Sequence, residues 1–118
     1  AVAHPADHEP ATMHFGAYRN GALVGVATLV ASPLPGGASE VTGVAVEYGH
    51  RGKGVGGLLL DACLAAAADG GARSVAAAVP ATAHGFFDHA GFDRVGDPYE
   101  APDGTPHYRM SRPATVIG

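Results

Sequence analysis

The stretch HRGKGVGG at residues 50–57 contains four glycines and is followed at once by an Ala- and Leu-rich segment, 58–69. That composition predicts a helix, and the apolar segment 40–46 ahead of the glycines predicts a strand. A strand, a glycine loop and a helix in this order direct several backbone N–H groups and the positive end of a helix dipole at one place. Glycine leaves this backbone uncovered and permits positive φ. The stretch therefore predicts an anion site, most often one for phosphate.

The part of the chain ahead of the glycines predicts an antiparallel hairpin. Segments 13–18 and 23–31 are rich in strand-forming residues. The pair Asn20-Gly21 between them favours a type I′ turn. The Pro- and Gly-rich segment 32–39 predicts a loop that leads into the strand before the glycines.

The predicted helix has a polar face and an apolar face. Asp61 and Asp69 fall on one side with Ala65 between them. Gly70 and Gly71 end the helix. The same spacing turns four residues toward the interior: Leu58, Leu59, Cys63 and Ala66.

The rest of the chain predicts the other half of a sheet. Segment 74–79 is apolar without alternation, which is typical of a strand covered on both faces, and its place after a strand and a helix predicts parallel pairing. Thr82 favours the start of a second helix, and segments 92–95 and 107–111 predict two last strands. The predicted fold class is α/β, an α+β mixed sheet with an antiparallel hairpin, a parallel β-α-β core and C-terminal antiparallel strands.

Length and composition narrow the classes of function. The 118 residues suit one domain, expected over 13–113 between a flexible arm, 1–12, and a tail, 114–118. A net charge of -4 argues against a nucleic-acid partner. The single cysteine, Cys63, excludes an internal disulfide and a cysteine-based zinc cluster, and no metal site is predicted. No apolar run reaches about 18 residues, so we expect no membrane segment and a cytoplasmic location.

Three of the glycines also spell the dinucleotide fingerprint GxGxxG, at Gly52, Gly54 and Gly57. That fingerprint requires an acidic residue at the end of the next strand to bind ribose, and here the next strand ends AAAVPAT without a carboxylate. A Walker P-loop is excluded because no GxxxxGK precedes a Ser or Thr. A nicotinamide dinucleotide site is therefore the weaker alternative.

Residues Arg51-Gly52-Lys53-Gly54-Val55-Gly56 match Arg/Gln-x-x-Gly-x-Gly/Ala, the pyrophosphate-binding signature of the GCN5-related N-acetyltransferase (GNAT) superfamily. Residues 83–92, AHGFFDHAGF, look like the family's helix that ends in an aromatic pair and is followed by Gly-Phe. Residues 103–107, DGTPH, resemble the C-terminal hairpin of the small ElaA-like bacterial members. The resemblance runs from about residue 13 to 113 and implies the GNAT acyl-CoA N-acyltransferase fold.

By this resemblance, acetyl-coenzyme A (acetyl-CoA) binds where the two central parallel strands diverge. The loop amides would hold the pyrophosphate, and the backbone of residues 44–46 would pair with the pantetheine arm. The N–H of Val46 would lie near the thioester carbonyl and stabilise the oxyanion. The implied cofactor-binding residues are Val44, Ala45, Val46, Arg51, Gly52, Lys53, Gly54, Val55, Gly56, Gly57, Phe86 and Phe87.

An amine must lose a proton before it attacks the thioester, and either a carboxylate or a chain of water molecules is expected to remove it. Glu40 is the first candidate, because it lies six residues before Val46 and period-two alternation places both on one face of the strand. Glu47, just past the strand, is the second candidate.

Members of the family often use a tyrosine to protonate the leaving thiolate. By the resemblance, Phe87 stands at that position in this chain and cannot donate a proton. A thiol with a pKa near 8.5 leaves without an acid. His107 either borders the acceptor side, as in relatives, or ties the turn 102–106 together. A water or one of three side chains is the substitute for the missing acid: His84, His89 or Tyr99.

The function implied is that of an acetyl-CoA dependent N-acetyltransferase acting on the primary amine of a small molecule or peptide. The alternative is a module that binds CoA without turnover. Family members usually begin with a strand and one or two helices that build much of the acceptor pocket, where this chain has only a Pro-rich arm. We therefore expect an acceptor site that is open or is completed by the partner in a homodimer.

Overall fold

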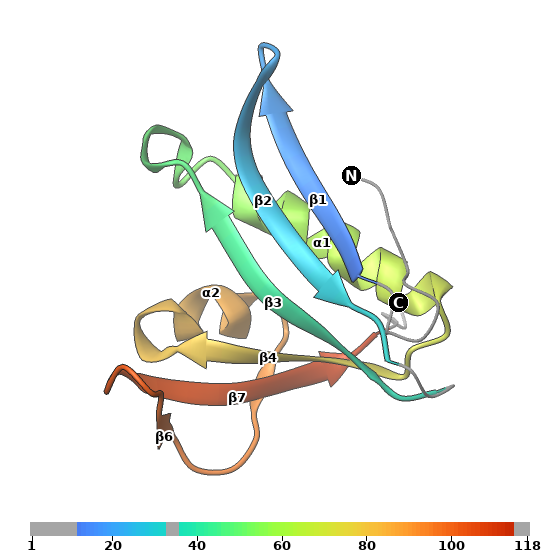
Figure 1. The fold of residues 1–118 in the computed structure, drawn as a ribbon, viewed down its shortest axis with the longest axis vertical. Helices are drawn as coiled ribbons and strands as arrows, with labels where there is room; N and C mark the ends of the chain where they lie inside the picture. The colour runs from blue at the N-terminus through green and yellow to red at the C-terminus, as the bar shows by residue number, and fades with distance from the viewer. Residues whose placement is uncertain (1–11, 33–35, 115–118) are drawn as a thin grey trace.

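The computed structural model describes residues 12–32 and 36–114, and within them seven strands form one sheet in the order β1-β2-β3-β4-β7-β5, with β6 paired to β7 (Figure 1). This confirms the predicted mixed sheet. The predicted arm and tail lie outside the described residues, apart from Thr12 and Ala114. The strands are β1 (Thr12–Arg19), β2 (Ala22–Val30), β3 (Ala38–Val46), β4 (Ser74–Pro80), β5 (Asp93–Arg94), β6 (Tyr99–Glu100) and β7 (Pro106–Pro113). The helices are η1 (Tyr48–His50), α1 (Val55–Asp69), η2 (Ala81–Ala83) and α2 (His84–His89).

The expected hairpin is formed by β1 and β2, which pair antiparallel from Thr12↔Val30 to Arg19↔Ala22. Asn20 has φ +51° and Gly21 has φ +81°, the two positive values that a type I′ turn needs. The sequence prediction of this turn is therefore confirmed.

Both α-helices pack on one side of the sheet, here called the helix face. Helix α1 contacts β1 to β4, and α2 contacts β4. The opposite side carries no described helix and is called the open face. The buried core on the helix face is drawn from both helices, from β2, β3, β4 and β7, and from residues beside α2 and β7: Val24, Ala27, Leu29, Val41, Val75, Ala77, Val79, Val55, Leu59, Leu60, Cys63, Leu64, Ala67, Phe87, Phe92, Met110 and Ala114.

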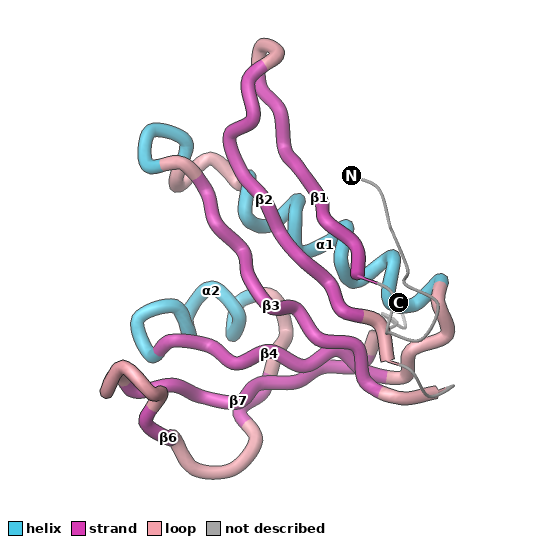
Figure 2. The backbone as a smooth tube through the Cα atoms, viewed as in Figure 1, coloured by secondary structure: helices cyan, strands magenta, loops and turns pink. Residues whose placement is uncertain are grey.

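The two central strands are paired only at their starts. Ala38–Val41 of β3 runs parallel to Ser74–Ala77 of β4. Beyond that, β3 is paired only with β2, while β4 continues along β7 to Pro80. Figure 2 shows β3 and β4 separating like the arms of a V. The centre of the sheet therefore opens, and backbone groups on the facing edges of both strands are released from sheet pairing.

A β-bulge marks the point of divergence. Leu29 pairs with Val41 and Thr28 with Gly43, so Thr42 has no partner of its own on β2. The extra residue moves the two-residue alternation of β3 by one position beyond Thr42.

Helix α1 confirms the predicted polar face, because Asp61, Ala65 and Asp69 are exposed. The prediction that Leu58 faces the interior is wrong, since 69% of its surface is exposed. The helix begins at Val55, whose side chain is buried. Counting from Val55, the helical period turns Leu59, Leu60 and Leu64 toward the core and leaves Leu58 outside. No described helix is long and apolar enough to cross a membrane.

Two further expectations need correction. Strand β4 is not covered on both faces: Ala76 is half-buried and Ala78 is exposed, because no described helix lies over the open face. Thr82 does not cap the second helix. It lies within η2, and α2 follows from Ala83 without a side-chain hydrogen bond at its N-cap.

Gly25 is the point of closest approach between β2 and the start of α1. A Cβ there would lie 2.9 Å from Leu59 Cδ1, 3.1 Å from Val55 Cγ1 and 3.2 Å from the carbonyl oxygen of Ala45. Replacing Gly25 with alanine should lower the free energy of unfolding by about 1–3 kcal/mol through overpacking. Urea unfolding measures this loss. The matched control is Gly43→Ala, which adds a Cβ with no heavy atom within 4 Å and should have little effect; an equal loss in both variants would contradict the close approach.

Cys63 is fully buried in α1, and desolvation raises the pKa of its thiol from 9.0 to about 11. Because the thiolate is the reactive form, we expect no reaction with a thiol reagent in the native protein at pH 8. Reaction should begin only when urea unfolds the chain, which absorbance of the released chromophore records. Fast labelling under native conditions would show that α1 does not stay packed on the sheet.

Candidate functional site

The glycine loop forms one wall of a groove of about 550 Å³, here called the loop groove. Its other walls are the end of β3 and the side of α2. All but one of the predicted cofactor-binding residues line it; Lys53 does not, and two residues that were not predicted do. The lining residues are Val44, Ala45, Val46, His50, Arg51, Gly52, Gly54, Val55, Gly56, Gly57, Ala83, Phe86 and Phe87.

Backbone groups dominate the loop side of this groove. Gly52 and Gly54 have φ of +77° and +81°, which side chains rarely adopt, and Gly54 is the N-cap of α1. The N–H of Leu58 is bonded to the oxygen of Gly54, so the N–H groups before it in the first turn have no acceptor within the helix. The first turn of α1 contains no acidic residue. The loop can therefore receive an anion on uncovered N–H groups.

The cations of the loop are less central than its backbone. Arg51 is exposed, donates from Nε to the carbonyl oxygen of Val46 at 3.2 Å and has its guanidinium carbon 5.4 Å from the centre of the Tyr48 ring. Lys53 is exposed outside the lining. Arg51 thus ties the loop to the end of β3, and both cations add charge at the rim.

The hydrogen bonding of β3 shows which of its backbone groups face the groove. The N–H of Glu47 donates to the oxygen of Val24 at 2.8 Å. Opposed residues of an antiparallel pair alternate between bonded and non-bonded, so Val46, opposite Gly25, points its N–H and C=O away from β2. Val44 does the same two residues earlier. Both therefore present backbone groups to the gap left by β4.

Aromatic rings close the floor of the groove. Phe86 and Phe87 meet edge to face, with centroids 5.2 Å apart, and Phe87 meets Phe92 in the same way. A Cβ on Gly56 would come within 3.2 Å of the Phe86 ring, so glycine lets α1 and α2 approach here. Phe87 is wedged in the core and has no hydroxyl to offer.

His50, at the end of η1, is the first of the two lining residues that were not predicted. Its Nδ1 is covered from solvent and has no hydrogen-bond partner among the described residues. An unpaired buried polar atom is costly, so a ligand group that reaches this ring can satisfy an atom that the free chain leaves unpaired. Periodicity gave no signal for His50, although it directly precedes the signature.

A second cavity, of about 320 Å³, lies in the gap between the diverging strands and is called the strand cleft. It shares Val44, Ala83 and Phe87 with the loop groove, so the two spaces meet there. His107 is its one titratable lining residue. The lining is Val41, Thr42, Gly43, Val44, Ala78, Pro80, Ala83, Phe87 and His107.

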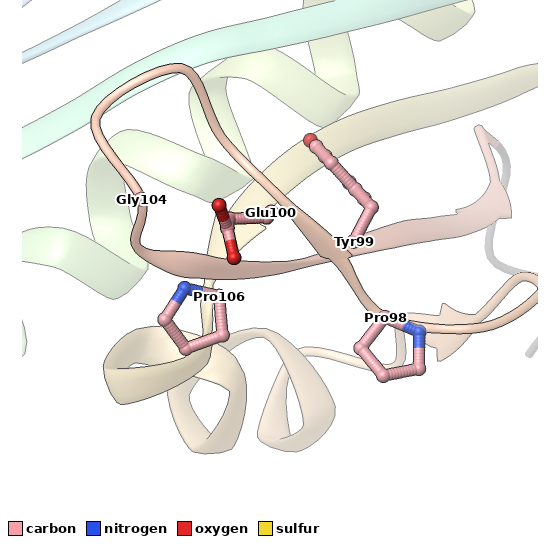
Figure 3. A pocket seen from close by; sticks show the side chains of 5 residues that line it. All are labelled: Pro98, Tyr99, Glu100, Gly104 and Pro106. Carbon is pink, nitrogen blue, oxygen red and sulfur yellow. The ribbon is translucent and has the colours of Figure 1, made fainter.

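A third cavity, of about 400 Å³, lies at the hairpin of β6 and β7 and is called the hairpin pocket. Figure 3 shows the five residues around it, of which Glu100 alone carries a charge. Tyr99 also lies beside His107, with ring centroids 5.8 Å apart, so this pocket adjoins the ring that lines the strand cleft. The five residues are Pro98, Tyr99, Glu100, Gly104 and Pro106.

The structure separates the predicted catalytic residues. Val46 lines the loop groove, but the inference that Glu40 shares its face is wrong. Val46 pairs with Gly25 on the helix face, whereas Glu40 pairs with Val30 on the open face, because the bulge at Thr42 reverses the alternation.

Glu40 lines none of the three cavities, and its Oε1 lies 4.0 Å from Nη2 of Arg109. Glu47 and His89 are exposed and line none of them either. His84 is bonded through Nδ1 to Asp88 at 2.9 Å. The roles of Glu40, Glu47 and His89 stay predictions. Within residues 12–32 and 36–114, no three metal-binding side chains gather.

Comparison with known families decides the assignment that this geometry suggests. The sequence model of the Acetyltransferase (GNAT) family matches residues 2–92. The chain belongs to this family. The resemblance drawn from residues 51–56 is thereby confirmed. No curated protein matches the chain.

Solved GNAT structures agree with the fold. Nourseothricin acetyltransferase is 28% identical, with a TM-score of 0.78 over 95% of this chain and 69% of that one. ElaA from Escherichia coli is 25% identical, with a TM-score of 0.74 over 86% and 68%, in line with the resemblance of residues 103–107. An aminoglycoside 6′-N-acetyltransferase complexed with coenzyme A is 14% identical and shares the fold, with a TM-score of 0.77 over 91% and 75%.

Gly54→Val tests whether the GNAT loop holds a phosphate group. The variant should weaken binding of coenzyme A by more than about tenfold, or 1.4 kcal/mol, because a branched side chain would cover the N–H groups of the loop. Isothermal calorimetry measures the affinity.

The matched control is Gly71→Val at the far end of α1. Gly71 has φ +85°, close to the +81° of Gly54, and neither glycine has a heavy atom within 4 Å of an added Cβ. Both variants carry the same backbone strain, so equal affinities for coenzyme A would rule out the loop as the phosphate site.

Proposed function

We propose that this GNAT protein transfers the acetyl group of acetyl-CoA to a primary amine by direct attack on the thioester. The observation that carries the proposal is the meeting of the loop groove and the strand cleft at Val44, Ala83 and Phe87. One space suits a long phosphorylated ligand, and the other leads through the opened sheet to its open face. A thioester at the junction would be reached from both sides.

The residues present fit coenzyme A. The free N–H groups at the start of α1 suit a pyrophosphate. The N–H and C=O groups of Val44 and the N–H of Val46 have no partner strand and suit the amides of a pantetheine arm, which would lie against β3 as an added strand. The C=O of Val46 already accepts from Nε of Arg51. Phe86 and Phe87 give the apolar wall. Bound there, acetyl-CoA would supply an acetyl group activated as a thioester.

The chain's own contribution to the chemistry is placement and charge stabilisation. The N–H of Val46 points into the gap and can donate to the carbonyl oxygen as it becomes an oxyanion. The strand cleft directs the acceptor nitrogen to the carbonyl carbon and keeps the rest of the acceptor on the open face. Phe87 supplies no proton, so the thiolate leaves by virtue of its own low basicity or takes a proton from another group.

The acceptor class is an amine of a small molecule or a peptide. A net charge of -4 favours cationic acceptors. Two carboxylates add to this charge: Glu40 lies on the open face of β3, and Glu100 lines the hairpin pocket. Two relatives carry the names of amine-bearing antibiotics, nourseothricin and aminoglycosides. A second copy of the chain would complete the acceptor site in a homodimer.

Thiol release from acetyl-CoA, followed with a chromogenic reagent, tests the proposal against polyamines, aminoglycosides and lysine-containing peptides. We expect release that depends on the amine and an acetylated product of the matching mass. Calorimetry runs in parallel with coenzyme A and with NAD. If coenzyme A binds but no amine causes thiol release, the protein is a CoA-binding module and not an acetyltransferase. If NAD binds and coenzyme A does not, both of these hypotheses are rejected.

A further inference from the structure

We propose that His107 is the general base of the transfer, and that the turn Asp103-Gly104-Thr105 is the device that orients it. The proposal rests on the proposed function and deepens it. It names a group that family resemblance did not place in catalysis, and it gives that group a defined tautomer and a defined route for the proton.

The position of His107 is set by three strands. On β7 it pairs with Pro80 of β4 on one side and with Tyr99 of β6 on the other. The ring lines the strand cleft together with Val44 and Phe87, the residues at which the cleft meets the loop groove. An amine that enters from the open face therefore passes this imidazole before it reaches the junction.

Its hydrogen bonds determine which ring nitrogen is basic. Nδ1 lies 3.2 Å from the carbonyl oxygen of Thr105, and a carbonyl can only accept, so Nδ1 carries the hydrogen. Nε2 is then the nitrogen with the free lone pair, on the ring edge away from the turn. A base held in one tautomer by a second group is the arrangement that catalytic histidines need.

The turn is itself held rigidly. Oδ1 of Asp103 accepts from the hydroxyl of Thr105 at 2.7 Å and from its N–H at 3.0 Å. These two bonds, with a smaller contribution from the charge of His107, lower the pKa of the Asp103 carboxyl. The threonine hydroxyl also lies 3.4 Å from Nδ1 of His107. The Asp103 carboxylate therefore fixes Thr105, whose carbonyl oxygen and hydroxyl both contact Nδ1 of the ring.

The other polar groups near the ring have separate partners or positions. Tyr99 flanks it from β6, and Arg109 follows it on the open face of β7, paired with Glu40 of β3. From β4 it faces only Ala78 and Pro80, which carry no charge. Asp103 is thus the carboxylate linked to His107 through Thr105, while Glu40 lies 4.0 Å from the guanidinium of Arg109.

The proton balance needs no further reactant. Nε2 of His107 takes one proton from the ammonium, and the neutral amine nitrogen forms a bond to the carbonyl carbon. The C–S bond then breaks, and the sulfur keeps the electron pair. The new amide nitrogen gives up its second proton. One of the two protons ends on the thiolate, which the imidazolium of His107 can supply, and the other leaves to solvent. His107 thereby acts first as the base and then as the acid, and it supplies the proton that a phenylalanine at position 87 cannot.

The decisive experiment compares pH profiles of kcat/KM for thiol release, with the best amine of the wild-type panel. At pH 7, His107→Gln should lose about 100-fold in rate, the size usual for a general base. The loss should shrink toward pH 10, where a much larger share of the amine is neutral without help. Affinity for coenzyme A should stay unchanged, because His107 does not line the loop groove. His14→Gln is the matched control, an exposed histidine that lines none of the three cavities.

Glu40→Gln decides between the two candidate bases. A pH-dependent loss in Glu40→Gln, with His107→Gln like wild type, would overturn the proposal in favour of the carboxylate. An equal loss of kcat/KM in His107→Gln at every pH would also overturn the proposal, because a residue with a purely structural role lowers kcat/KM by the same factor at every pH. Absence of release by the wild type with every amine would reject the proposed function and this inference together.

A second measurement requires neither turnover nor a variant. Nitrogen and carbon chemical shifts of the His107 ring, in the wild-type protein with coenzyme A bound, report which nitrogen carries the hydrogen. We expect the Nδ1–H tautomer at pH 8. The Nε2–H tautomer in the wild type would refute the assignment of the base.

Discussion

Pairing between β3 and β4 stops after four residues on each strand, and the rest of the site depends on that stop. A parallel pair that continued would consume the backbone groups of residues 42–46 and leave no cleft. The bulge at Thr42 coincides with the stop and bends the strand away. Unpaired N–H and C=O groups are costly in the interior of a sheet. Here they border two cavities, in which a ligand can pair with them.

The bulge also changes which residues of β3 face each side of the sheet. Before Thr42, Glu40 points to the open face and pairs with Arg109. After it, Val44 and Val46 turn their side chains to the helix face and their backbone to the gap. A strand without the extra residue would place Glu40 and Val46 on one side, as simple alternation predicts. The inserted residue instead leaves Glu40 on the open face and turns Val44 and Val46 to the helix face, where both line the loop groove.

The sequence predicts most of the fold and most of the residues that line the loop groove, because those parts depend on local rules. Glycine at 52 and 54, alanine in α1 and Asn20-Gly21 each specify a backbone conformation without reference to distant residues. The face of Glu40 could not be predicted, since a bulge depends on how two strands fit together. The predicted burial of Leu58 was wrong for a related reason. The first buried residue of α1 is Val55, which lies within the glycine-rich stretch that predicts a loop. The sequence left two interpretations of His107 open. Its surroundings are formed by β4 and β6, the strands on either side of it, and the fold brings these together.

An anion site made from peptide groups has a consequence for how the protein responds to its medium. Salt screens exposed cations strongly, and groups in a closed contact much less. In this chain the cations at 51 and 53 are exposed, whereas the uncovered N–H groups proposed to hold the anion lie at the start of α1. Ligand affinity should therefore depend only weakly on ionic strength. An anion held by these N–H groups would stay bound at salt concentrations that weaken binding to a lysine-lined pocket.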